Sequence, residues 1–496
     1  MVSTMRQSPL AEPHRPHERA KIEPLLFRYA SHMNTTTQDL AVTWANYTSR
    51  VTYDDLPDTV RSILRWLVLD TISTTLAANT LGVGIPQLLS WARGAGGAPE
   101  ATLIGFGDRL PAAAAAMVNG GMAHSLNYDD TTAVGSGHLG PVTFPSAFAA
   151  AELRGGASGK ELMASIAVGA EMMSRIGVAL FKAQVSYTEA KPQPTQMPGF
   201  FASALSASRM LDFDALQTHS ALGLAFMQAS GGRQPVLDGR PAKAIYAAFS
   251  NQGGMQAALL TRHGLLGDCN VFEGKAGFFP TYYDNVFDRA SMLDGLGENF
   301  FLTNVGFKPW PTTDVAHVFI AAAADLHRDL NPADVQRVRI IGEPHLASFC
   351  EPSQIRRNPK APVEAEDSVL FTTAKALATG DMTLTDLQPT PQGLFDQQAV
   401  RIANLIEWEI DESLGRSGIV EVTLTSGEVR TRYIDKAPGH RDNPLTDDQR
   451  QQKFITCAQH AGSKLSEASL RQVIDLIAHL EDVPDVRVLS ALLSGG

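Results

Sequence analysis

The stretch "NYDDTTAVGSGHLGPVTFP", residues Asn127 to Pro145, decides between two fold classes. Its Gly135, Gly137 and Gly140 fit the spacing G-x-G-x-x-G of a dinucleotide-binding loop, which would predict a parallel α/β fold. Such a loop follows a buried strand and opens a helix, with an acidic residue about 20 positions later. Here a polar Asn-Tyr-Asp-Asp segment precedes the glycines, and prolines crowd the residues after them. We therefore predict a polar site loop that binds no dinucleotide.

On both sides of this loop the chain has a helical pattern. The run after Pro57 carries apolar residues at three- and four-residue spacing, and proline is a good first-turn residue. Ser158 and Glu161 form a capping-box pattern before another apolar run. Residues 200–230 predict two helices rich in small residues, separated near 212–214. Small residues let helices approach closely, so we expect a compact bundle.

The pattern changes after about residue 305. Residues 335–343 and 418–434 are β-branched and alternate with a period of two, which is typical of strands. Ser426-Gly427 occupies the position of a hairpin turn. A helical segment, residues 312–330, lies between the strand patterns, and the chain is helical again after residue 446.

These patterns predict a mostly α protein, with a large all-helical domain and a smaller inserted α/β domain. We place the first part of the helical domain at residues 37–304, the α/β domain at 305–437, and the C-terminal return to the helices at 438–496. Residues 1–36 have no periodicity and are expected to be a disordered extension. An organellar presequence in residues 1–34 is the weaker interpretation, because acidic residues are unusual in one.

The composition argues against several classes of protein. The 496 residues are 44% hydrophobic and 19% charged, as in an ordinary globular protein. The formal net charge of −11, without a Lys/Arg run, argues against a nucleic-acid partner. Cys269, Cys350 and Cys457 are isolated, which argues against a disulfide framework or a cysteine metal site and favours a reducing, cytoplasmic compartment. No apolar run reaches the roughly 18 residues of a membrane span, so no membrane partner is expected.

Several stretches, taken in order along the chain, resemble one family. "NGGMAHSLNYDD", followed by His138, resembles the site loop of the MmgE/PrpD family, which includes 2-methylcitrate dehydratase, cis-aconitate decarboxylase and iminodisuccinate epimerase. "SGKELMASIAVGAEMMSRIG", "FKPWPTTDVAH" and "NPLTDDQRQQKF" match in the same order, and the matches cover almost everything from about residue 37 to 496. The resemblance implies a helical main domain, a smaller α/β lid, a homodimer, and a site between the domains that needs neither cofactor nor metal.

Carried over position by position, the resemblance places catalytic residues at Asp130, Thr131, His138, Lys243 and Lys308. The three named reactions build negative charge beside a carboxylate, and fixed cations and hydrogen-bond donors can stabilise that charge. The two lysines would hold substrate carboxylates, and His138 would move the proton near neutral pH. Asp130 and Thr131 would orient His138 or hold a substrate oxygen. Without the resemblance, the Asp pair is equally well explained as a cap or loop anchor. His138 is then better explained as a structural or solvated side chain, and Lys243 and Lys308 as surface lysines.

Substrate contacts are expected at six further positions, Asn127, Asp129, Gln193, Tyr246, Thr313 and Phe371. Five of them depart from the family pattern. Asn127 replaces an acid, Gln193 and Thr313 each replace a histidine, Phe371 replaces a tyrosine, and Tyr246 replaces a frequent histidine. Amide side chains exchange no protons near neutral pH, and phenylalanine neither donates nor accepts a hydrogen bond. One proton transfer through His138 stays feasible, whereas a mechanism with two bases lacks residues.

The departures lead us to expect a changed substrate or reaction. The first hypothesis is a cofactor-independent lyase of the dehydratase type, which removes a proton α to a carboxylate and expels water from a small di- or tricarboxylate such as an alkylcitrate. Decarboxylation of the cis-aconitate type ranks second and epimerisation third. A non-catalytic protein that binds a carboxylate or a partner is the alternative from another class. All versions require the two lysines and His138 to converge.

Overall fold

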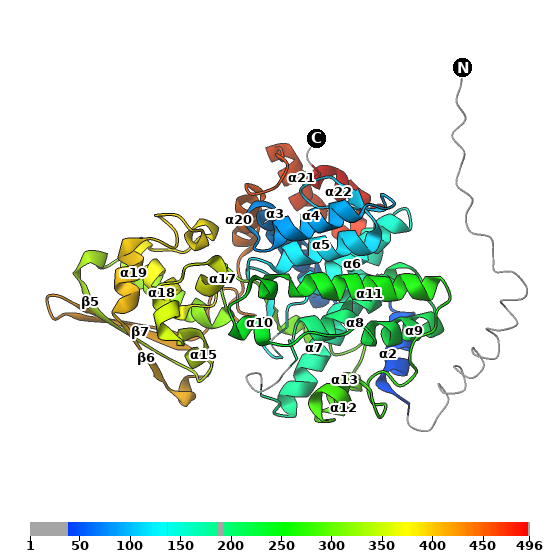
Figure 1. Ribbon diagram of the computed structural model, residues 1–496, viewed down its shortest axis with the longest axis horizontal. Coiled ribbons are helices and arrows are strands. Elements are labelled where there is room, and N and C mark those ends of the chain that lie inside the picture. The colour runs from blue at the N-terminus through cyan, green and yellow to red at the C-terminus, as the bar shows by residue number, and fades with distance from the viewer. Residues whose placement is uncertain (1–37, 136, 187–191, 495–496) are drawn as a thin grey trace, which may run out of the picture.

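The computed structural model describes residues 38–135, 137–186 and 192–494. The expectations for residues 1–36 lie outside the described residues. Figure 1 shows a large helical body and a smaller unit that contains a sheet at one end of the molecule. A mostly α fold with a large helical domain and a smaller α/β domain is therefore confirmed.

The helical domain is built around α11, which packs against α5, α6, α8 and α9. In turn α7 packs on α8, and α3 packs on α20 from the C-terminal return. The bounds are α2 Leu40–Thr48, α3 Asp58–Leu81, α4 Ile85–Ala95, α5 Ala112–His124, α6 Gly140–Leu153, α7 Gly159–Lys182, α8 Gln196–Met210, α9 Ala215–Phe226, α10 Gln234–Leu237, α11 Tyr246–Arg262, α12 Phe278–Tyr283, α13 Arg289–Leu293, α20 Asp447–Ala458, α21 Glu467–Ala478 and α22 Arg487–Leu493.

The predicted helix starts are present. Pro57 directly precedes α3, and Ser158 caps α7 in a capping box: the Glu161 N–H donates to the Ser158 hydroxyl over 3.3 Å, and the Ser158 N–H donates to the Glu161 carboxylate over 2.7 Å. Asp214 separates α8 from α9 as the cap of the latter. The long apolar α7 meets the length and hydropathy of a membrane span, but 89% of that window is buried inside the protein, as in a core helix.

The α/β domain holds a four-stranded sheet in the order β6-β5-β7-β8. The strands β5 and β6 are parallel, whereas β5–β7 and β7–β8 are antiparallel. The hairpin between β7 and β8 turns at Ser426-Gly427, where Gly427 has φ +86°. The bounds are β5 Val335–Gly342, β6 Ile406–Ile410, β7 Gly418–Leu424, β8 Val429–Ile434, α14 His317–His327, α15 Leu346–Cys350, α16 Ser353–Arg357, α17 Pro362–Ala365, α18 Val369–Thr379 and α19 Gln397–Asn404.

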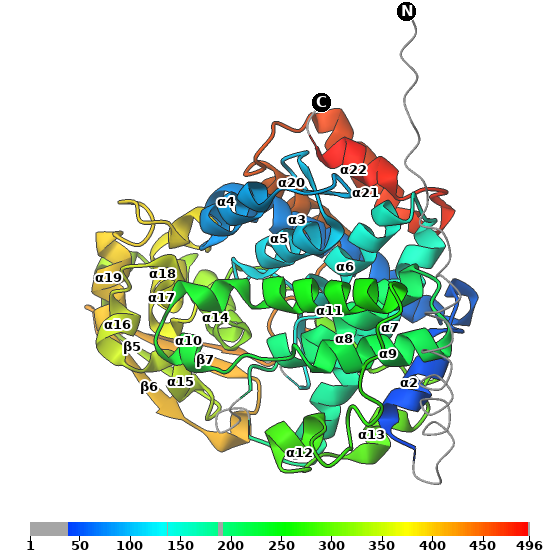
Figure 2. The same cartoon turned by 45° about the vertical axis from the view of Figure 1, so that its right-hand side comes forward.

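Two apolar cores result from this arrangement. One is built almost wholly from residues up to Phe307 and after Leu445, and the other from residues 316–424. In the second core α14 packs on β7 and β8, α19 packs on β5, and α18 packs against both helices. Figure 2 shows this second unit, which we call the lid, at the end of the molecule opposite α2 and α13. The chain crosses between the cores near residue 308 and again near residue 437, and these crossings position the site.

Candidate active site

The glycine-rich stretch is a close-packed loop that leads into α6. The Asp130 carboxylate accepts hydrogen bonds from the backbone N–H groups of Leu139, over 2.7 Å, and Gly140, over 2.9 Å, so it caps that helix. A Cβ on Gly140 would lie 2.1 Å from the Thr71 hydroxyl, and Gly135 has φ +88°. The glycines therefore serve close approach and turning. The strand that precedes them has two residues and pairs antiparallel with another two-residue strand, whereas a dinucleotide loop follows a buried strand of a parallel sheet.

A short strand pair brings this loop to the first crossing between the domains. β3 (Thr131–Thr132) pairs antiparallel with β4 (Val305–Gly306), two residues before Lys308. The Lys308 ammonium then donates to the Asn127 backbone oxygen over 3.0 Å and to its side-chain oxygen over 2.7 Å. Two segments almost 180 residues apart in the chain thus form one wall of the site.

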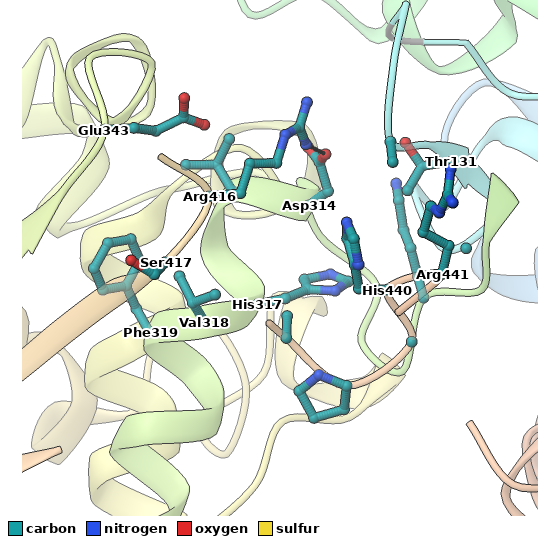
Figure 3. A pocket seen from close by; sticks show the side chains of 17 residues that line it. Thr131, Asp314, His317, Val318, Phe319, Glu343, Arg416, Ser417, His440 and Arg441 are labelled. Carbon is teal, nitrogen blue, oxygen red and sulfur yellow. Dashed lines mark hydrogen bonds and ion pairs between the residues drawn. The ribbon is translucent and has the colours of Figure 1, made fainter. Parts of the chain in front are cut away.

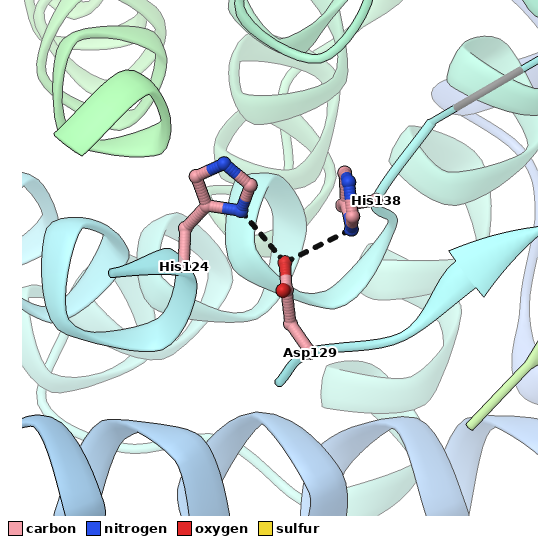
Figure 4. Close-up of side chains that lie close together, drawn as sticks. All are labelled: His124, Asp129 and His138. Carbon is pink, nitrogen blue, oxygen red and sulfur yellow. Dashed lines mark hydrogen bonds and ion pairs between the residues drawn. The ribbon is translucent and has the colours of Figure 1, made fainter. Parts of the chain in front are cut away.

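Two imidazoles share one carboxylate at the centre of the loop (Figure 4). The Asp129 Oδ2 atom lies 2.8 Å from Nδ1 of His124 and 3.1 Å from Nδ1 of His138. His138 Nδ1 also lies 2.6 Å from the Asp130 backbone oxygen, and the two rings are 4.9 Å apart between centroids. Because carboxylate and carbonyl oxygens accept hydrogen bonds, both Nδ1 atoms carry the proton. Both Nε2 atoms are then the reactive nitrogens.

The charge states follow from burial and from this sharing. Burial lowers the pKa of His124, and the Asp129 carboxylate offsets only part of the effect. Burial opposes ionisation of Asp129 too, but the two imidazoles hold the pKa of that carboxyl well below its usual range. His124, Asp129 and His138 also form a donor set of the type that binds metal ions. The direct hydrogen bonds between them account for their positions without an ion.

The two lysines differ in their partners. The Lys243 ammonium lies 2.5 Å from the Glu366 carboxylate and 3.2 Å from that of Asp367, and these acids raise its pKa above the usual range although burial opposes this. Burial instead lowers the pKa of Lys308, whose hydrogen-bond partners are the neutral oxygens of Asn127. Within the described ranges Lys308 forms no direct ion pair. Asn127 also donates to Asp367 over 3.2 Å, which links the two lysines through one chain of hydrogen bonds.

A cleft between the helical domain and the lid collects these groups. Its empty volume, with the open mouth included, is about 850 Å³. From the helical domain and the first crossing it is lined by His124, Asn127, Thr131, His138, Gln193, Lys243 and Lys308. From the lid it is lined by Thr313, Asp314, Glu343, His345, Asp367 and Arg416. Figure 3 shows the adjoining part of the cleft, where the ion pair of Arg416 with Asp314, at 2.6 Å, forms a wall.

The structure therefore brings together seven of the residues expected in the site. They are Asn127, Thr131, His138, Gln193, Lys243, Lys308 and Thr313. The convergence of both lysines with His138 is observed, although Lys243 is already neutralised by lid carboxylates. Gln193 lines the cleft while its Oε1 atom caps α8 by accepting N–H bonds from Thr195 and Gln196.

Four expected residues lie outside the lining. Asp129 holds the imidazoles from behind, and Asp130 caps α6 with both oxygens occupied. Tyr246 is buried behind His124, with the ring centroids 6.3 Å apart. Phe371 is fully buried in the lid core on α18, where it packs with apolar residues and does not line the cleft. Its aromatic ring serves the core of the lid in this structure.

Sequence reasoning missed several groups of the site. His124 ends an apolar helix, Asp367 and Glu366 follow a short lid helix, and Arg416 lies in a lid loop. His124 had a signal, because it stands five residues before Asp129, at the end of the helix that leads into the site loop. The lid residues had none, since only the packing of the lid brings Glu366 and Asp367 to Lys243 and Arg416 to the cleft.

The comparison with known proteins agrees with this two-domain site. The MmgE/PrpD N-terminal domain profile matches residues 42–289, and the MmgE/PrpD C-terminal domain profile matches residues 310–479. The chain belongs to the MmgE/PrpD family. Three relatives of this MmgE/PrpD protein carry related names. The chain is 26% identical to the cis-aconitate decarboxylase-like protein oryM of Aspergillus oryzae, over 91% of this chain and 96% of the relative.

The other two relatives are cis-aconitate decarboxylases. The protein of Homo sapiens is 26% identical, with 78% of this chain and 80% of the relative covered. The protein of Aspergillus terreus is 23% identical, with 90% of this chain and 94% of the relative covered. The relatives support an enzyme of the lyase type whose substrate is a small polycarboxylate.

Proposed function

We propose that the protein is a cofactor-independent lyase that decarboxylates an unsaturated tricarboxylate of the cis-aconitate type. The observation that carries the proposal is Lys308, a buried ammonium with neutral hydrogen-bond partners that faces the same cleft as His138. A buried charge without a counterion is costly, and a substrate carboxylate would offset that cost. The names of the relatives support the same substrate class.

One proton transfer completes this reaction. The bond between a carboxylate carbon and its methylene carbon breaks, and its electron pair forms a new C=C bond. The electrons of the old C=C bond move to the carbon beside another carboxylate, which takes the proton from Nε2 of protonated His138. CO₂ leaves, and solvent returns a proton to the imidazole. Lys308 would stabilise the negative charge on that neighbouring carboxylate during the transfer.

Dehydration of a hydroxytricarboxylate such as an alkylcitrate is the second candidate. It needs a base for the α-proton and an acid for the departing hydroxyl group. The presence of two imidazoles on one cleft favours this version, because a neutral His124 and a protonated His138 would fill the two roles.

A single assay separates these candidates. Purified protein is incubated with cis-aconitate, citrate and alkylcitrates, and the products are identified by mass spectrometry as loss of CO₂ or loss of water. His138→Asn is the test variant, and His479→Asn, at an exposed position of the C-terminal helices, is the matched control. We expect loss of CO₂ from cis-aconitate that falls roughly 10²–10⁴-fold in the test variant alone. Binding without conversion of any acid would point instead to the non-catalytic alternative.

A further inference from the structure

The cleft has a second chamber that neither imidazole of the His124–His138 pair lines (Figure 3). Its empty volume, with the open mouth included, is about 660 Å³, and it shares Lys308, Asp314 and Arg416 with the catalytic part. Its remaining walls come from both crossings between the domains, around Gly306 and at residues 437–441, and from the start of α14. The chamber is therefore located where the two domains are joined.

One wall of this second chamber holds a buried imidazole nitrogen that needs a donor. His317 is 3% exposed, and its Nε2 atom has no hydrogen-bond partner among the described residues. The ring also forms a hydrogen bond with the Thr312 backbone. Because Nε2 has no partner in the described part of the chain, we assign this bond to the Nδ1 proton. Burial and the Lys308 charge lower the pKa of His317 to about 3, so the ring is neutral and Nε2 is a bare acceptor. An unsatisfied buried acceptor calls for a ligand or water that donates.

Other residues that line the chamber supply donors. The Asp442 N–H donates to Nδ1 of His440 over 3.1 Å, so in the neutral ring the proton is on Nε2, which can donate. Arg441 and Lys308 add a guanidinium and an ammonium to the same chamber. Arg416 forms an ion pair with Asp314 in the wall that both chambers share, so we do not count it among the donors for a ligand. These groups suit the oxygens of a carboxylate.

We propose that the second chamber binds an α-hydroxycarboxylate, with the carboxylate toward His440, Arg441 and Lys308 and the hydroxyl group donating to Nε2 of His317. This goes beyond the proposed lyase activity, since binding here requires no turnover. Two sources supply the same chemistry, namely the far end of a long substrate or a separate hydroxy acid.

The test compares two dicarboxylates that differ by one hydroxyl group, malate and succinate, by titration calorimetry on the full-length protein. We expect malate to bind roughly tenfold more tightly, because succinate leaves Nε2 unsatisfied. His317→Leu removes the acceptor and should reduce the difference to about twofold or less, whereas His317→Gln, which can place an oxygen near the Nε2 position, should retain it. His479→Leu is the matched exposed control.

Arg441→Ala provides a second variant, at an exposed position. This variant should lower the affinity for both acids by a similar factor and keep the preference for malate. Equal affinities in the wild type, or a full preference in His317→Leu, would overturn the proposal and leave water as the partner of Nε2. An unchanged affinity in Arg441→Ala would overturn the carboxylate assignment. Competition of malate with the tricarboxylate substrate would identify the far end of the substrate as the source, and inhibition without competition would identify a separate acid.

Discussion

At the residue scale, Lys308 and Lys453 are two of the buried lysines, and their surroundings are opposite. Lys308 donates to neutral oxygens of Asn127, while Lys453 donates to the Asp70 carboxylate over 2.6 Å and to two backbone oxygens. Removing one partner of a buried ion pair destabilises the fold, because the other charge stays buried alone. A buried charge without a counterion lowers stability, and a substrate of opposite charge can offset that loss. The identity of residue 127 decides this difference, because an aspartate there would neutralise Lys308 directly.

Replacing Lys308 should therefore separate stability from function. We expect Lys308→Met to be at least as stable as the wild type, because it removes a desolvated charge, and to lose roughly 10²–10³-fold in kcat/KM. Thermal unfolding and steady-state kinetics measure the two quantities. A large drop in Tm would contradict our view that this ammonium lacks a counterion.

The two ring nitrogens of His124 can be tested separately, because only Nδ1 contacts the Asp129 carboxylate. His124→Asn places an amide N–H near the Nδ1 position and removes Nε2, whereas His124→Gln does the reverse. If Nε2 transfers a proton, His124→Asn should fold normally and lose activity roughly 10²-fold or more. His124→Gln should instead lose thermal stability, since Asp129 loses a donor. Equal activity in His124→Asn and the wild type would limit this residue to holding Asp129.

At the element scale, α20 ties the C-terminal return to the site. Its Lys453 donates to the backbone oxygens of Tyr128, over 2.7 Å, and Lys308, over 2.9 Å, and it pairs with Asp70 on α3. The ammonium also lies 3.9 Å from the centre of the Tyr128 ring. One side chain thus joins α20, α3, the site loop and the first crossing between the domains.

Loss of this connection should be costly. We expect Lys453→Met to destabilise the protein by about 3–5 kcal/mol, because Asp70 stays buried without its partner. The double variant with Asp70→Asn should recover part of the loss. Chemical unfolding measures both, and Lys308→Met is the matched control, a buried lysine without a carboxylate partner. Similar unfolding free energies for the two single lysine variants would contradict the distinction between them.

The elements themselves could largely be predicted. The Ser158–Glu161 capping box, the break near Asp214 and the Ser426-Gly427 hairpin depend on residues close together in the chain, and all three are present. The β3–β4 pair could not be predicted, because each strand has two residues and its partner lies far away in the sequence. Short strands carry no periodicity, so only the packed fold reveals them.

At the scale of the whole molecule, the lid is held against the helical domain by charges from both sides. Lys243 of the helical domain pairs with Glu366 and Asp367 of the lid, and Asn127 also donates to Asp367. Burial raises the pKa of Glu366 to about 7, although Lys243 opposes this. The contact between the lid and the helical domain therefore involves a carboxyl group whose pKa is close to neutral pH.

Buried neutral histidines should make the molecule sensitive to acid. His317 has its pKa lowered to about 3 in the fold, so between pH 6.5 and 3 the unfolded chain binds the proton and the folded protein does not. Stability should be full above pH 6.5 and fall as the pH drops, by about 2 kcal/mol between pH 7 and 5 from this group. Chemical unfolding across that range measures it. His317→Gln should flatten the slope, and an unchanged slope would show that the imidazole is protonated in the fold.

The homodimer implied by the family resemblance stays a prediction. One chain has a mass of 53.3 kDa. Analytical ultracentrifugation of the full-length protein should give twice that mass. A single species at the mass of one chain would contradict it.

The sequence by itself determined the helices, the hairpin, the two-part architecture and the family, because periodicity, caps and turn residues act over a few positions. It also placed His138, Lys243 and Lys308 on one cleft through the resemblance. Only the tertiary structure decided that Lys243 is paired, that Lys308 has neutral partners, that His124 joins His138 on Asp129, and that Phe371 belongs to a core. The reason is that the charge state of a buried group depends on its partners and its burial, and packing brings those partners from distant parts of the chain.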